Sequence, residues 1–296
     1  MSVGKATRRA LAGIGYLLLG LLAAAGVILS CAFLLVSTDL GRGLVVPRLL
    51  RAVDEALAGS IALEGFHLLG EGGLELVGAK VIDPDGDVVL TVERARAYVD
   101  LGRLRSRTIG LRVELDRPEV VLKREEDGGL SLARAFAPAH PKPKDEPSTP
   151  FTWTVRLTRL TLRQGSVRYL DATGRTAFAA ERMDADARAI YGPDRAGAEL
   201  SLRGEMTAPE RAPLVVEAAG GLRGGVLRVR QLRLAAGDTA LEAVAQLQQA
   251  TWSGRAAVLA LAVDAEQVRR FAPQAPLTGD LTGTLYAESD GRAATA

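Results

Sequence analysis

A series of short segments in which apolar and polar residues alternate is the feature that most constrains the fold. Between Gly59 and Leu132 this alternation predicts strands at Ile61–Leu69, Leu74–Asp83, Asp87–Leu101, Ile109–Asp116 and Glu119–Lys123. Successive side chains of a strand point to opposite faces, so a strand such as Ile109–Asp116 has one apolar and one polar face. The alternation is less regular between Val88 and Val99, where Glu93, Arg94 and Arg96 interrupt it. Gly, Asp and Pro turns separate the segments, which predicts hairpins and disfavours strand–helix–strand units.

The alternation continues in the second half of the chain. Leu281 and Leu285 alternate with Thr282, Thr284 and Tyr286 in a late strand. A slip of phase near Thr158–Arg159 predicts a bulge, and Ala265–Ala272 is the one further helix that we expect after the first 58 residues. The sequence therefore predicts an all-β meander.

An uncharged apolar run precedes the strands. Residues 10–38 carry no charged side chain, and this length suffices for a transmembrane helix. Basic residues in the tail 1–9 place the N-terminus in the cytoplasm and the bulk of the chain across the membrane. A cleaved signal peptide would have a shorter apolar core. Lipid attachment at Cys31 is a second alternative, although the apolar run continues beyond it.

Two further segments divide the chain. Residues 43–58 have apolar residues at helical spacing, which predicts an amphipathic helix that ends at Gly59. Residues 138–150 contain five prolines and predict an exposed loop. This loop separates a first β segment, 59–137, from a second, 151–296. The sequence leaves open whether the loop is a domain boundary or an insertion in one continuous sheet.

The charges and the few metal-binding side chains exclude several functions. The 37 Lys and Arg residues nearly balance the 35 Asp and Glu residues, and they are interspersed along the strands, which argues against nucleic acid as a partner. One cysteine and two separated histidines cannot form a Cys/His zinc site. We therefore predict no metal and no cofactor.

No catalytic motif stands out. The carboxylates of Asp83, Asp85 and Asp87 alternate as in a calcium loop, but the spacing of Gly and Glu in an EF-hand is missing, so we predict a hairpin turn. Gly220–Gly225 lacks the Lys-Ser/Thr of a phosphate loop and is interpreted as a turn. G-x-S-x-G and H-E-x-x-H do not occur. We do not expect an enzyme.

The order of several motifs resembles the start of the AsmA/TamB superfamily of Gram-negative envelope proteins. After the apolar run and the amphipathic segment come GSIALEGF at 59–66, LELVGAKVIDPDG at 74–86, AYVDL at 97–101, LRVELDRPEVVL at 111–122 and DGGLSL at 127–132. Ser131 stands where the family often has Asn. The second half resembles the family more loosely, through LTLRQGSVRYLD at 160–171 and LTGDLTG at 277–283.

This resemblance implies an elongated, twisted antiparallel β-groove with an apolar inner face, anchored in the inner membrane, reaching into the periplasm and continuing in a longer protein. It implies a role in outer-membrane biogenesis, with phospholipid as the expected partner. Alternatives are strand augmentation of outer-membrane β-proteins, with an outer-membrane assembly component as partner, or a structural scaffold. The residues that we expect to line the groove are Ile109, Leu111, Val113, Leu115, Leu281 and Leu285.

Overall fold

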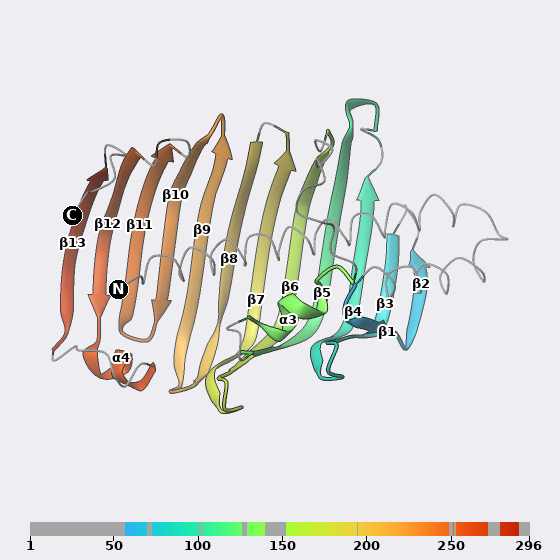
Figure 1. Ribbon diagram of the computed structural model, residues 1–296, viewed down its shortest axis with the longest axis horizontal. Helices are drawn as coiled ribbons and strands as arrows, with labels where there is room; N and C mark the ends of the chain where they lie inside the picture. Colours follow the sequence, from blue (N-terminus) through green and yellow to red (C-terminus); the bar gives the residue numbers. More distant parts are fainter. Residues whose placement is uncertain are drawn as a thin grey trace.

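A single large β-sheet accounts for most of the described part of the chain. The computed structural model describes residues 57–69, 73–100, 102, 104–125, 129–139, 152–193, 195–248, 251, 253–271 and 279–289. Within them, thirteen strands form one sheet in the order β1-β3-β4-β5-β6-β7-β8-β9-β10-β11-β12-β13, and β2 also pairs with β3. The strands stand side by side along the long axis of the molecule, from β2 to β13 (Figure 1).

The elements follow one another with short connections in most places. The strands are β1 Ser60–Ala62, β2 Gly65–Leu69, β3 Gly73–Ile82, β4 Val88–Asp100, β5 Thr108–Lys123, β6 Thr154–Leu170, β7 Thr176–Gly192, β8 Arg195–Ala208, β9 Ala212–Arg223, β10 Val226–Ala236, β11 Thr239–Gln248, β12 Ser253–Val263 and β13 Leu281–Ser289. The helical segments are η2 Leu104–Ser106, α3 Ser131–Ala135 and α4 Ala265–Phe271. The predicted all-β class is confirmed, and α4 begins where it was expected.

One junction of the sheet is parallel, which corrects the expectation of a purely antiparallel sheet without strand–helix–strand units. β5 and β6 pair in parallel, with Leu111 opposite Leu157, whereas the other strand pairs are antiparallel. A parallel pair needs a crossover connection, and here the connection carries α3. Because β5 and β6 pair directly, the sheet is continuous on both sides of the Pro-rich segment.

Irregular residues change the predicted strand limits. The two strands expected on either side of Arg117 form the single strand β5. Arg117 is an irregular residue inside this strand, with a positive φ of 49°, and the strand continues beyond it. The bulge predicted near Thr158–Arg159 is confirmed, since the β6–β7 register shifts between Leu157 and Leu160. The strand expected at Ile61–Leu69 is divided into β1 and β2, which pair with different parts of β3.

The predicted hairpin turn at Asp83 is confirmed. The Asp83 amide donates to the Asp87 carbonyl at 2.9 Å, and the Gly86 amide donates to the Asp83 carbonyl at 3.0 Å. The Asp83 carboxylate also accepts hydrogen bonds from the amides of Asp85 and Asp87. Gly86 has a φ of 91°, which favours glycine at this position.

Several predicted segments lie outside the described residues. These are the tail 1–9, the expected transmembrane helix 10–38, residues 43–56 of the amphipathic segment and most of the Pro-rich segment 138–150. At the end of the amphipathic segment, Leu57 forms a β-bridge with Pro138, so a helix does not extend to residue 58. None of the helices among the described residues is long and apolar enough to cross a membrane.

Candidate functional site: the apolar face of the sheet

The register of the strands separates an apolar face from a polar face. Residues directly opposite each other on neighbouring strands project to the same side of the sheet. Starting from Leu68 on β2, partner-to-partner steps lead to Leu285 on β13 through apolar residues only. The row consists of Leu68, Leu74, Ala97, Val113, Leu160, Ala187, Leu200, Ala218, Leu232, Ala243, Val258 and Leu285.

The adjacent row lies one residue along each strand, except on the bulged β12, where it lies two residues along. It faces the opposite side and is almost entirely polar. It runs from β2 to β12 through His67, Glu75, Arg96, Glu114, Thr161, Asp186, Ser201, Glu217, Arg233, Glu242 and Ala260. We call these two surfaces the apolar face and the polar face. The apolar face thus continues over twelve strands and the polar face over eleven, although bulges interrupt the alternation within single strands.

The apolar face is packed near β4–β6 and exposed on β10 and β13, and Leu68 on β2 is also 39% exposed. Near β4–β6, Val99, Leu111 and Leu157 form a buried cluster, and Leu111 is only 1% exposed. On β10 and β13, by contrast, large apolar side chains are open to solvent. Their exposed fractions are 41% for Leu227, 38% for Leu234, 49% for Leu281 and 63% for Leu285.

All six predicted lining residues belong to the apolar face, but they form two separate groups. Ile109, Leu111, Val113 and Leu115 alternate along β5, where Ile109 and Val113 pack against the buried cluster of Leu111. Leu281 and Leu285 lie on β13, opposite Val263 and Val258 of β12. The β13 pair is exposed, whereas Leu111 is buried, so the two groups offer different access to a ligand.

Sequence reasoning missed most of the apolar face between β7 and β12. Its side chains there include many alanines, which carry a weak hydrophobic signal, together with Leu200, Leu232, Leu234 and Val258. A bulge on β10 between Val229 and Leu232 also hides the alternation. A search that allowed the apolar/polar alternation to shift its phase by one residue at a bulge could have found these residues.

Ion pairs organise the polar face. On β3 and β4, Arg96 donates from Nε to Glu75 at 2.6 Å, and this hydrogen bond lowers the pKa of the Glu75 carboxyl. On β6 and β7, Arg159 donates to Asp186 at 2.8 Å and lowers the pKa of that carboxyl. These shifted groups are paired structural charges, so their titration gives no indication of acid or base catalysis.

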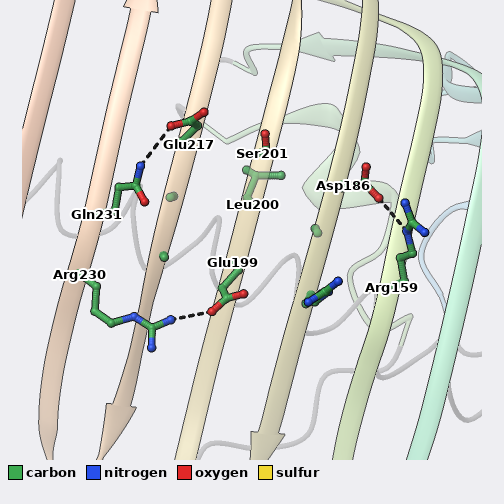
Figure 2. Close-up of a pocket in the computed structure, with 12 residues that line it drawn as sticks. Arg159, Asp186, Glu199, Leu200, Ser201, Glu217, Arg230 and Gln231 are labelled. Carbon is green, nitrogen blue, oxygen red and sulfur yellow. Dashed lines mark hydrogen bonds and ion pairs between the residues drawn. The ribbon is translucent and has the colours of Figure 1, made fainter.

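An open depression of about 790 Å³ lies over β6–β10. Its rim carries the Arg159–Asp186 pair, the Arg230–Glu199 pair at 2.7 Å, and Gln231, which donates to Glu217 at 3.1 Å (Figure 2). Positive and negative groups alternate around the depression and neutralise one another. The depression therefore does not present the concentrated charge that a phosphate or nucleic acid requires.

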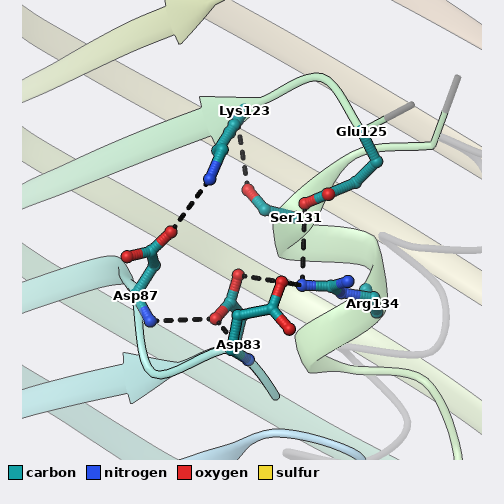
Figure 3. Close-up of polar contacts among 7 residues, drawn as sticks. Asp83, Asp87, Lys123, Glu125, Ser131 and Arg134 are labelled. Carbon is teal, nitrogen blue, oxygen red and sulfur yellow. Dashed lines mark hydrogen bonds and ion pairs between the residues drawn. The ribbon is translucent and has the colours of Figure 1, made fainter. Parts of the chain in front are cut away.

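An acidic cluster at the β3–β4 turn is the strongest metal-like arrangement among the described residues. Carboxylate oxygens of Asp83, Asp85 and Glu125 lie within 4.8 Å of one another. The guanidinium of Arg134 lies among them, 3.5 Å from Asp83 and 3.7 Å from Glu125, and it also pairs with Asp85 (Figure 3). Arg134 supplies the positive charge that a cation would otherwise provide.

Comparison with known proteins gives no family assignment. No protein-family model matches the chain, and no curated protein matches it. The apolar face is the candidate functional site, because its apolar row continues across twelve strands and carries exposed leucines. It can bind apolar chains by burying them, and its described residues hold no constellation that suits covalent chemistry.

Proposed function

We propose that the chain is an inner-membrane-anchored envelope protein that guides phospholipid acyl chains along the apolar face of its sheet in outer-membrane biogenesis. The observation that carries this proposal is the unbroken apolar row from Leu68 to Leu285. At about 4.8 Å between strands, the row extends for about 50 Å, which exceeds the hydrocarbon thickness of about 30 Å in a bilayer.

Burial of acyl chains supplies the free energy for this interaction. Each methylene removed from water contributes about 0.8 kcal/mol, and no directional contact is required. Exposed leucines such as Leu234 and Leu285 are accessible to such chains. The charged headgroup remains in water beside the sheet. The apolar run at 10–38 supports a location at the inner membrane, with the sheet on the periplasmic side.

A direct experiment is to identify and transfer lipid. We expect the purified chain to carry phospholipid, detected by mass spectrometry, and to move fluorescent phospholipid between liposomes. The double variant Leu281→Asp/Leu285→Asp should lose most of this lipid, because both side chains belong to the apolar face of β13. Absence of lipid and of transfer in the unchanged chain would contradict the proposal.

The same strand offers a matched control. Tyr286 is 62% exposed, close to the 63% of Leu285, but it projects to the opposite face. The variant Thr282→Asp/Tyr286→Asp therefore introduces the same charge on the same strand and should retain lipid. Circular dichroism of both variants establishes that the sheet is intact.

Strand augmentation is a second candidate function, favoured by the position of β13. This strand is the last in the sheet order, and all nine of its residues are exposed. An exposed strand with alternating residues, such as this last strand of the described sheet, can accept a strand of a nascent outer-membrane β-protein. Crosslinks from β13 to an outer-membrane assembly component, without bound lipid, would favour this function over lipid guidance.

A further inference from the structure

α3 covers one end of the apolar face. Its residue Ala135 is fully buried and packs with Val81 of β3 and Val89 of β4. Leu90 and Ile61, which are register partners of Val81 on the apolar face, join the same cluster. The helix contacts β4 and β5. The apolar residues of α3 thus occupy the surface that an acyl chain would otherwise use at this end.

Backbone hydrogen bonds attach α3 to the segment that leads into β1. The Gly59 amide donates to the Ala135 carbonyl at 3.0 Å, and the Ala58 amide donates to the Ala137 carbonyl at 2.8 Å. A Cβ atom on Gly59 would lie 2.4 Å from the Ile82 carbonyl oxygen, so only glycine permits this close approach. On the other side of the helix, the buried Ser131 hydroxyl accepts a hydrogen bond from the Lys123 amide at 3.1 Å.

Ion pairs fix the exposed side of α3 to the β3–β4 turn. Arg134 contacts Asp83, Asp85 and Glu125 (Figure 3). The Asp83 side chain is 1% exposed, and its carboxylate also accepts two backbone hydrogen bonds, so its position is fixed by the turn. Arg134 therefore joins a rigid turn to a helix of only five residues, which would have little stability alone.

The far end of the apolar face has no corresponding cover among the described residues. Leu227 and Leu234 on β10 and Leu285 on β13 are each more than a third exposed. α4 contacts the β10–β11 turn, where a Cβ on Gly237 would meet the Gln267 amide. This contact is with a turn at the ends of strands, and the leucines of β10 and β13 stay exposed.

We infer that α3 caps the part of the apolar face around Val81 and Leu90, so that phospholipid acyl chains occupy the exposed parts of the face, including β10–β13, and are excluded from the part under α3. This inference rests on the proposed lipid function. It assigns the lipid-binding part of the face, and it gives Arg134 a positioning role that needs no contact with lipid.

Photo-leucine incorporation tests this distribution with only a small change in the shape of the leucine side chains. The whole chain, labelled in this way and incubated with vesicles of phosphatidylethanolamine and phosphatidylglycerol, is irradiated and mapped by peptide mass spectrometry. We expect lipid adducts at Leu234 and Leu285 and about tenfold fewer at Leu90, which corresponds to about 1.4 kcal/mol of exclusion by α3. Equal labelling of Leu90 and Leu234 would overturn the inference and leave the lipid function standing.

Absence of lipid adducts from every leucine would instead overturn the proposed function.

Two variants of the labelled chain test the role of α3. Arg134→Ala removes the ion pairs that hold the helix and should raise adduct formation at Leu90. The matched control Arg159→Ala removes an ion pair on the polar face and should leave the Leu90 adducts unchanged.

If Arg134→Ala lowers the circular dichroism signal of the sheet, the variant Asp85→Asn is used in its place. The Asp85 side chain is 57% exposed, so this variant weakens the ion pairs of Arg134 at a position that is open to solvent. Unchanged Leu90 labelling in a folded Arg134→Ala or Asp85→Asn variant would show that Arg134 does not hold α3 in place. This result would overturn that part of the inference.

Discussion

Leu111 and Leu285 project from the same face of one sheet, but Leu111 is 1% exposed and Leu285 is 63% exposed. The first belongs to a buried cluster with Val99 and Leu157, and the second stands on the last strand in the sheet order. One continuous apolar surface thus combines a packed core with a part that is open to solvent.

Substitutions in the packed and in the open part of this surface should therefore lower the stability of the fold by different amounts. We expect Leu111→Ala to lower the free energy of unfolding by about 2–5 kcal/mol, because it leaves a cavity in a packed cluster. The exposed Leu281 has no such packing, and Leu281→Ala should stay within about 0.5 kcal/mol of the unchanged chain. Urea denaturation of both variants measures the difference, and equal losses would refute the distinction.

The Asp83 turn should be more important for stability than its counterpart at Asp171. Both carboxylates accept hydrogen bonds from two backbone amides of a five-residue turn, but only Asp83 also faces Arg134 in a buried position. Asp83→Ala should lower the free energy of unfolding by about 1–3 kcal/mol. Asp171→Ala should have a smaller effect, and thermal unfolding of the two variants compares them.

Glycines of neighbouring strands should also differ in their tolerance of a methyl group. A Cβ on Gly254 would lie 2.1 Å from the Gln246 carbonyl oxygen, whereas a Cβ on Gly283 would meet no atom within 4 Å. We expect Gly254→Ala to destabilise the sheet by about 1–3 kcal/mol. Gly283→Ala should be neutral or slightly stabilising, by up to about 1 kcal/mol. Chemical denaturation of both proteins would reveal a contradiction if their midpoints moved together.

Acid should weaken the contact between Glu75 and Arg96. Because the hydrogen bond with Arg96 lowers the pKa of Glu75 in the folded chain, this contact contributes stability above the unfolded pKa of about 4.3. That contribution is lost as the pH falls through the lower folded pKa. The free energy of unfolding should thus fall more steeply on acidification in the unchanged chain than in Glu75→Gln.

The matched control for this pH dependence is Glu119→Gln. Glu119 is exposed on β5, and its replacement removes the same kind of charge while it keeps the contact between Glu75 and Arg96. Urea titrations at several pH values between neutral and about pH 3 provide the measurement. A slope that is the same in Glu75→Gln and the unchanged chain would contradict the prediction.

The strands could be predicted from sequence because alternation within a strand is a local property. The predicted limits of β3, β4 and α4 agree with the structure to within one or two residues. The parallel β5–β6 pair could not be predicted, since alternation is the same in parallel and antiparallel strands. α3 was missed because five residues are too few to establish a helical period.

The candidate site depends on register, which the sequence does not encode locally. Leu111 and Leu285 could be recognised as apolar positions, but their common face follows from eight successive pairings through the seven strands between them. One slip of register would invert a whole strand. The register shifts at bulges near Gln164, Arg182 and Arg230, so that apolar residues on both sides of each bulge keep the same face. These shifts can be recognised only when the partner strands are known.

From β6 to β12, the antiparallel pairing makes the hairpin a unit of evolutionary change. Duplication of one hairpin would lengthen the sheet by about 9.6 Å. All remaining strands would keep their direction, and their side chains would keep their faces. Insertion of a single strand would instead reverse the direction of all strands that follow it. Length could therefore be tuned between related chains in steps of two strands, without redesign of the surface on which an acyl chain would lie.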